Sequence, residues 1–230
     1  SLSEVVSLRT EGDMHRYNYT DCLSRVCKLA NALVGLGIKK GDRVATLAWN
    51  GYRHLELYYA ISGIGAVCHT INPRLSPEQM LYIIEHAGDR LLFVDTTFVP
   101  IIEKLIPKLP KNLVIIVMAS SDDSSTLSDN FLNYEQLILE SSHDIIWPEF
   151  PENTAAGLCY TSGTTGNPKG ALYSHRSTVL HALTTSLNLG PSLGDGMKVL
   201  PVVPLFHVNA WGLPYAAPLT GPSLIFPGPT

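Results

Sequence analysis

The sequence is poor in charged residues, which make up 16% of its 230 residues, against about 25% in an average globular chain. Because 45% of the residues are hydrophobic, this composition excludes an intrinsically disordered chain. Basic residues are not in excess either: 16 Lys and Arg stand against 20 Asp and Glu, a net charge of −4. A dedicated DNA- or RNA-binding protein needs basic side chains to pair with phosphates, so we expect no nucleic-acid partner.

Cysteine is also scarce, with four residues and no Cys-x-x-Cys pair. The His and Cys residues lack the spacing of a zinc site, and His175 and His181 are interpreted as structural or solvent-facing. We therefore expect free thiols in a reducing compartment, the cytoplasm. The first residues carry charges early and lack the apolar stretch of a secretory signal, so no such signal is expected.

Charge is absent between Val199 and Thr230, unless His207 is protonated. This run is longer than the roughly 20 apolar residues of a membrane helix, but seven prolines interrupt it and exclude a continuous helix. We expect no transmembrane segment, and interpret the run as buried strands and a short helix around a pocket. A core this apolar should be covered by further chain, so we expect the sequence to be the front part of a longer protein.

Alternating strands and helices predict a mostly parallel α/β sheet. Thr20 is placed to cap a helix that stops at Gly35 and Gly37, and Ser76 to cap another, with a capping box, that ends at Gly88. The other expected helices cover 52–64, 97–107 and 133–141. Strands are expected at 43–48, 66–71, 90–95, 113–117, 155–160 and 170–174, and a polar surface loop at 119–130.

The most informative run is TSGTTGNPKG, residues 161–170, which follows an apolar strand. Its glycines allow backbone N–H groups to turn toward an anion without a Cβ clash, and its four hydroxyls add donors. Lys169 adds a mobile positive charge suited to a polyphosphate. The run is not a Walker A loop, because Lys169 follows Pro168 rather than glycine. It predicts a site for a triphosphate or pyrophosphate.

This run is identical in form to the phosphate-binding signature of the adenylate-forming (AMP-binding) superfamily, which includes acyl-CoA synthetases and the adenylation domains of peptide synthetases. The resemblance extends over nearly the whole chain, through residues 29–50, 69–95 and 173–177. It implies that residues 1–230 form the N-terminal portion of the large domain, with mostly parallel sheets flanked by helices. The remainder of that domain and the small C-terminal domain are absent.

The segment PLFHVNAWGLPY, residues 204–215, is most similar to the long- and medium-chain fatty acyl-CoA synthetases. In that subgroup the His of the Phe-His-Val motif lies beside the acyl-adenylate, which implies this place for His207 and Val208. Trp211 resembles the gate residue of the fatty-acid tunnel and is the candidate substrate residue. Taken alone, His207 and Trp211 would each be interpreted as a buried core side chain.

The resemblance also implies roles for the glycine-rich run. Lys169 and His207 become the candidate catalytic residues, and Thr161 the candidate ligand of Mg²⁺. The residues implied to contact the nucleotide are Thr161, Ser162, Gly163, Thr164, Thr165, Gly166, Lys169, His207 and Val208.

The implied reaction is that of a fatty acid–CoA ligase. A carboxylate and ATP form acyl-AMP and pyrophosphate, and coenzyme A then forms the thioester, with Mg²⁺ required. Fatty acids or related carboxylates are the implied substrates, and relatives suggest a homodimer. The later acidic, ribose-binding and lysine motifs are absent, so we expect no turnover by this chain alone. Two alternatives stay open: an enzyme that adenylates an aryl or amino acid, and a non-catalytic scaffold.

Overall fold

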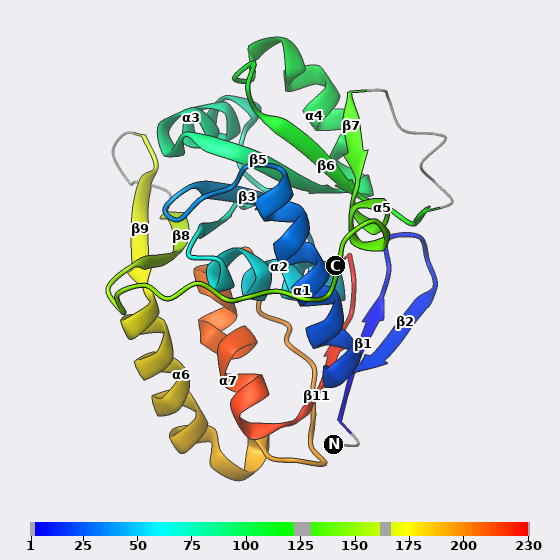
Figure 1. The fold of residues 1–230 in the computed structure, drawn as a ribbon, viewed down its shortest axis with the longest axis vertical. Coiled ribbons are helices and arrows are strands. Elements are labelled where there is room, and N and C mark those ends of the chain that lie inside the picture. The colour runs from blue at the N-terminus through cyan, green and yellow to red at the C-terminus, as the bar shows by residue number, and fades with distance from the viewer. Residues whose placement is uncertain (1–2, 122–129, 162–166, 230) are drawn as a thin grey trace.

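A computed structural model describes residues 3–121, 130–161 and 167–229. Most of the strands form a seven-stranded sheet in which every neighbouring pair is parallel except the last, β8 with β9 (Figure 1). In spatial order the strands are β7 (Phe131–Asn133), β6 (Val114–Met118), β5 (Asp89–Asp95), β3 (Arg43–Leu47), β4 (Val67–Thr70), β8 (Ala155–Thr161) and β9 (Lys169–Ser174). The predicted mostly parallel α/β fold is confirmed.

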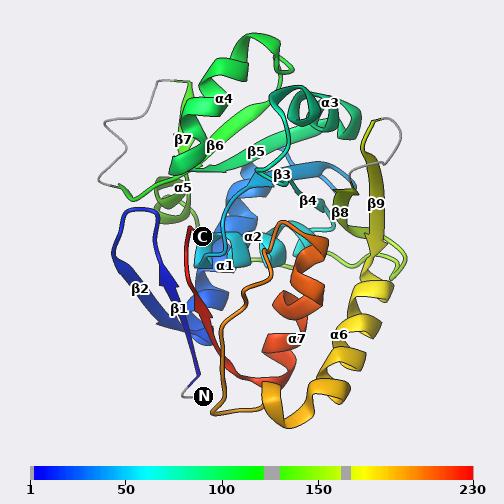
Figure 2. The same ribbon diagram turned by 180° about the vertical axis from the view of Figure 1, so that it is seen from behind.

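Helices cover both faces of this sheet, and β5 shows why. Successive side chains of a strand point to opposite faces. Leu91 and Phe93 of β5 belong to the core under α1, α2 and α5, whereas Leu92 and Val94 belong to the core under α3 and α4 (Figures 1 and 2). These helices are α1 (Tyr19–Gly35), α2 (Tyr52–Gly63), α3 (Pro77–Ala87), α4 (Val99–Leu105) and α5 (Tyr134–Leu139).

A second sheet of four strands joins the two ends of the chain. β1 pairs in parallel with β11 and antiparallel with β2, and β10 pairs in parallel with β11. Val5 and Leu224, which face each other in this register, are almost fully buried. The strands are β1 (Glu4–Leu8), β2 (Met14–Asn18), β10 (Lys198–Val199) and β11 (Ser223–Phe226); α6 (His175–Leu189) and α7 (Leu213–Thr220) lie nearby.

The helix caps test the predictions made from local sequence. The expected cap at Thr20 is wrong: Asn18 caps α1, because its side chain accepts the Asp21 N–H at 2.9 Å in a capping box. Ser76 does cap α3 through the Gln79 N–H, and Gly88 ends that helix in the left-handed conformation at φ +65°. Both of these predictions are confirmed.

The predicted strands at 43–48, 66–71, 90–95, 113–117, 155–160 and 170–174 all appear, with ends shifted by a residue or so. The expected helix over 97–107 is divided into short turns at Thr96–Phe98 and Ile106–Lys108 around α4. Three short strands, β1, β2 and β7, were not predicted. Most of the expected polar loop at 119–130 lies outside the described residues.

The uncharged C-terminal run forms β10, α7 and β11, so the expected strands and short helix are confirmed. Some of its side chains are exposed in the described part of the chain. Trp211 is 66% exposed and Val202 is 76% exposed, and both border the same cavity. Within the described residues, no helix is long and apolar enough to cross a membrane.

Charged side chains hold α1, α2 and α5 together inside the protein. Arg25 of α1 binds Glu56 of α2 at 2.7 Å and Glu135 of α5 at 2.9 Å, and Arg53 binds Glu135 at 2.9 Å. The Tyr134 hydroxyl donates to Glu56 at 2.7 Å. Burial opposes ionisation of Glu135, yet the hydrogen bonds and charges of Arg25 and Arg53 lower its pKa to about 2.

Candidate active site

The ends of β8 and β9 hold the glycine-rich run. Thr161 ends β8 and lies opposite Lys169, the first residue of β9, and the Thr161 hydroxyl donates a long hydrogen bond to the Lys169 carbonyl at 3.5 Å. Both side chains are exposed, so the hydroxyl and the ammonium group are accessible to a ligand. Ser162, Gly163, Thr164, Thr165 and Gly166 lie outside the described residues.

The side chains of His207, Val208 and Trp211 are also exposed. The core position that His207 and Trp211 would each be given when taken alone is therefore not observed here. The backbone that follows His207 is unusual: Val208, Asn209, Ala210 and Trp211 all have positive φ, between 46° and 56°. A left-handed backbone costs roughly 1–3 kcal/mol for each residue other than glycine. Such outliers concentrate at ligand-binding and switch regions.

A buried asparagine holds the segment that leads to His207. The Asn50 side-chain amide donates to the carbonyls of Pro201 at 2.9 Å and Val203 at 3.0 Å, and its Oδ1 accepts the Leu205 N–H at 2.6 Å. Asn50 directly follows the end of β3 and is 7% exposed. It therefore fixes a distant loop at the carboxyl end of the large sheet.

The same segment contacts the strand that carries the glycine-rich run. The Thr70 hydroxyl, at the end of β4, donates to the Phe206 carbonyl at 3.4 Å and lies 3.2 Å from Cys159 Sγ on β8. The Cys159 thiol donates to Asn209 Oδ1 at 3.1 Å. Burial raises the pKa of Cys159, so the thiol keeps its proton at neutral pH. These contacts bring the His207 segment against β8, two residues before Thr161.

Two apolar cavities lie on either side of Trp211. One, of about 440 Å³, lies between α6 and residues 199–203; the other, of about 350 Å³, is bordered by Tyr173, Val208 and Tyr215. His181 of α6 lines both cavities and donates from Nε2 to the Trp211 carbonyl at 2.9 Å. This histidine thus borders the candidate site, although the sequence suggested only a structural or solvent-facing role.

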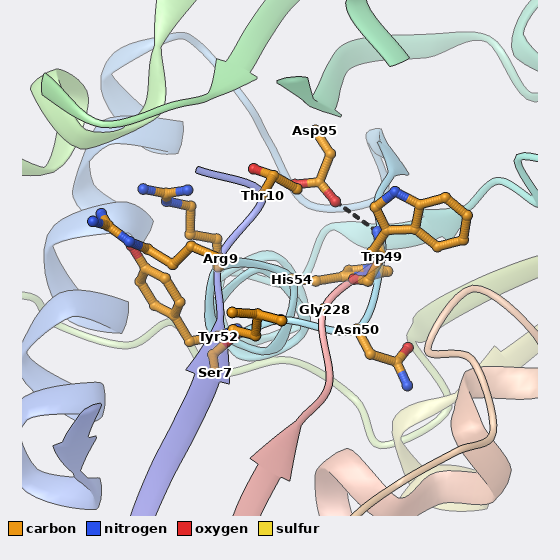
Figure 3. A pocket seen from close by; sticks show the side chains of 12 residues that line it. Ser7, Arg9, Thr10, Trp49, Asn50, Tyr52, His54, Asp95 and Gly228 are labelled. Carbon is orange, nitrogen blue, oxygen red and sulfur yellow. Dashed lines mark hydrogen bonds between the residues drawn. The ribbon is translucent and has the colours of Figure 1, made fainter. Parts of the chain in front are cut away.

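A third, more polar pocket lies at the carboxyl ends of β3 and β5 (Figure 3). The Trp49 N–H donates to the Asp95 carboxyl at 2.6 Å, and the Trp49 indole N–H donates to Thr97 at 2.9 Å. His54 bonds the Trp49 carbonyl through Nδ1 and Thr46 through Nε2. Burial raises the pKa of Asp95 to about 7. None of the predicted site residues lines this pocket. Its hydrogen bonds hold Trp49 and His54, on either side of Asn50.

Several residues of the candidate site were missed from sequence. Asn50, Tyr58 and His181 had no motif to distinguish them, although Asn50 follows a predicted strand, where parallel sheets commonly place functional groups. Asn209 stands inside the quoted segment 204–215 but received no role. Among the described side chains, no group of three His, Cys, Asp or Glu residues could hold a metal ion.

Comparison with known proteins identifies the class to which this fold and site belong. The AMP-binding enzyme family matches residues 3–230, so the chain belongs to that family. It is 51% identical over 227 residues to a medium-chain-fatty-acid–CoA ligase of Ectopseudomonas oleovorans, and 46% identical over 226 residues to a long-chain-fatty-acid–CoA ligase of Thermus thermophilus. These alignments cover 98% of this chain but 42% and 40% of the two ligases.

Solved structures agree with the fold. An anthranilate CoA ligase in complex with anthranoyl-AMP superposes with a TM-score of 0.81 at 24% identity, over 98% of this chain and 42% of that one. A Mycobacterium tuberculosis fatty acyl CoA synthetase gives a TM-score of 0.80 at 22% identity, over 99% and 42%. The observed layers are therefore those of the N-terminal region of adenylate-forming enzymes.

Proposed function

We propose that residues 1–230 are the N-terminal portion of the large domain of an ATP-dependent fatty acid–CoA ligase. The observation that carries the proposal is the contact between β8 and the His207 segment, made through Cys159 and Asn209. It supports a site in which Lys169, at the exposed start of β9, meets the phosphates of ATP and the two apolar cavities near Trp211 receive the acyl chain. A fatty acid has the matching chemistry, with a carboxylate head and an apolar tail. The identity of 51% to a medium-chain ligase supports this choice of substrate class.

The reaction proceeds in two steps. A carboxylate oxygen bonds to the α-phosphorus of ATP while the bond from that phosphorus to pyrophosphate breaks, which leaves acyl-AMP. The sulfur of coenzyme A then bonds to the acyl carbon, AMP departs and the thiol proton is released. The carboxylate is itself the nucleophile, so no Ser-His-Asp set is required. The first step joins two anions, and cationic or N–H groups must offset their charge.

Lys169 and the loop suit that first step. The Lys169 ammonium, at the exposed start of β9, stabilises the pyrophosphate as it leaves, and residues 162–166 supply the N–H and hydroxyl donors. Thr161 offers an exposed hydroxyl oxygen, a donor type that Mg²⁺ accepts, and this ion is commonly held by one or two protein oxygens plus phosphates. When bound, Mg²⁺ offsets the phosphate charge. Thr161 therefore fits as one of its ligands.

The His207 segment suits the acyl side. His207 and Val208 are exposed beside β8, where they contact the acyl-adenylate in this proposal, and Trp211 closes the passage between the two cavities. We further propose a homodimer and a cytoplasmic location. Four cysteines without a disulfide are consistent with a reducing compartment.

The test is carboxylate-dependent exchange between ATP and labelled pyrophosphate, measured on the longer protein that contains this chain. Octanoate and palmitate should support exchange with Mg²⁺ and, with coenzyme A added, give the acyl thioester. Benzoate and amino acids should support at most weak exchange. Preferred exchange with benzoate would instead indicate an aryl ligase, a class represented among the relatives by a benzoate–CoA ligase of Arabidopsis thaliana at 32% identity.

A further inference from the structure

The left-handed turn at Val208–Trp211 has no glycine, and the side chain of Asn209 ties it to the core. Asn209 Oδ1 accepts the Cys159 thiol proton at 3.1 Å and also accepts from the Tyr58 hydroxyl at 3.2 Å. Asparagine is among the few residues that adopt positive φ readily, and Asn209 has φ 50°. The residue thus combines the backbone that the turn needs with a side chain that fixes it from two other elements, α2 and β8.

Gly157 gives independent evidence that the amide belongs against β8. A Cβ at Gly157 would lie 3.2 Å from Asn209 Nδ2. A side chain at this position of β8 would therefore push the amide away from the strand. The glycine therefore leaves space for the Asn209 amide beside β8, four residues before Thr161.

The partners of Asn209 hold the chain on the other side of His207 as well. The Tyr58 hydroxyl shares its one proton between two acceptors: the Leu205 carbonyl at 2.5 Å, which is the nearer, and Asn209 Oδ1 at 3.2 Å. Burial raises the pKa of Tyr58 well above its usual value and that of Cys159 above its own, so both keep their protons and remain donors. His207 is therefore held from both sides by one buried group of hydrogen bonds that begins on β8.

We infer that Asn209 is a positioning residue, whose amide ties the strand of the phosphate loop to the turn that carries His207 and Trp211. This inference rests on the proposed ligase function. Asn209 borders the cavity of about 350 Å³, but its amide oxygen bonds Cys159 and Tyr58, and the role inferred for it is to position its neighbours. It holds His207 at the acyl-adenylate and Trp211 between the two cavities, so its loss should change how the acyl chain binds.

Asn209→Gly separates the amide from the backbone. Glycine accepts positive φ without strain, so the turn can still form while both hydrogen bonds are lost. In the longer protein, kcat/KM for palmitate should fall about tenfold, which is the effect expected for the loss of two hydrogen bonds. The KM of the fatty acid should rise, and the KM of ATP should stay the same. Asn209→Asp keeps the oxygen acceptor and should recover most of the activity. Asn112→Gly, at an exposed and remote asparagine, is the matched control.

Hydrogen exchange of the backbone amides, followed by mass spectrometry, supplies a readout without activity. Asn209→Gly should speed exchange in residues 207–212 and leave β3 and β5 unchanged. If it does so while the wild-type protein shows no pyrophosphate exchange, the positioning role stands and the ligase function is wrong. If the wild type is active and Asn209→Gly changes neither the KM of the fatty acid nor the exchange in 207–212, the inference is wrong. If Asn209→Gly does not fold, Cys159→Ala replaces it, because it removes one of the two donors to the Asn209 amide oxygen. The KM of the fatty acid should then change in the same direction by a smaller amount. An unchanged KM in Cys159→Ala would equally overturn the positioning role.

Discussion

The layer formed by α1, α2 and α5 keeps charged side chains inside the protein, whereas the region around Trp211 leaves apolar side chains outside. In the first, Glu56 is fully buried and Arg25 binds both Glu56 and Glu135. In the second, Trp211 is 66% exposed on a turn of positive φ. Each departs from the usual distribution of polar and apolar groups.

Both regions contain a locally unfavourable arrangement, and the consequence differs between them. A buried ion pair needs close partners on every side, so the charged cluster fixes the relative positions of three helices. An exposed apolar side chain on a strained turn gains little from folding, which is typical of a surface that meets a ligand. Substitutions should therefore affect mainly stability in the first region and mainly ligand handling in the second.

The largest expected effect is on stability, from Glu135→Ala. Removing this carboxylate leaves Arg25 and Arg53 with fewer partners inside the protein, and should lower the free energy of unfolding by about 3–5 kcal/mol. Urea denaturation measures it. Glu103→Ala, at an exposed position of α4, is the control and should stay within about 0.5 kcal/mol of wild type. A loss below 1 kcal/mol for Glu135→Ala would show that the cluster does not hold the helices.

The second prediction is a pH dependence caused by Asp95. Its pKa of about 7 in the folded protein lies above the roughly 3.9 of an unfolded Asp. The folded state therefore binds the proton more tightly, so stability is lost as pH rises from about 4 to about 7, by up to about 4 kcal/mol. Asp95→Asn should remove this loss, because an amide does not titrate in this range, and its oxygen can still accept the Trp49 N–H. Unfolding curves of both proteins from pH 4 to 8 check it, and parallel pH profiles would contradict it.

Lys169 lies exposed at the start of β9, so Lys169→Ala should not change the free energy of unfolding. If Lys169 stabilises the leaving pyrophosphate as proposed, the rate of acyl-AMP formation in the longer protein should fall roughly 10²–10³-fold, equal to about 2.7–4 kcal/mol. Thioester formation from supplied acyl-AMP should slow much less. Single-turnover measurements of the two steps distinguish them, and an equal loss in both steps would assign Lys169 to folding instead of catalysis.

The smallest expected stability effect is that of Trp211→Ala. A buried Trp would cost about 3–5 kcal/mol, but a side chain this exposed should cost less than about 1 kcal/mol. The preference for acyl-chain length should change instead, because the two cavities would merge. Thermal melts and activity against acids of increasing length decide it, with Phe93→Ala as the buried control that should lose several kcal/mol. A large fall in melting temperature with an unchanged length profile would indicate packing alone.

Local patterns in the sequence predicted what depends on neighbours along the chain. The alternation of strands and helices, the cap at Ser76 and the left-handed end at Gly88 were all confirmed. The cap of α1 was predicted at the wrong residue because Asn18 and Thr20 both precede the apolar positions of the helix. Only the hydrogen bond from the Asp21 N–H to the Asn18 side chain distinguishes the two. Strand β1 was missed because it is short and gains its stability from pairing with β11, across nearly the whole chain.

The sequence by itself determined the fold class and the family, and it singled out the glycine-rich run 161–170, since all three depend on runs of consecutive residues. Only the tertiary structure showed the left-handed backbone of residues 208–211 and the exposure of His207 and Trp211 on either side of buried Ala210. It also decided the roles of Asn50, Tyr58 and Asn209, whose hydrogen bonds reach partners about 50 to 155 residues away along the chain. Such contacts leave no periodic signal in a single sequence, since they depend on how the two sheets bring distant segments together.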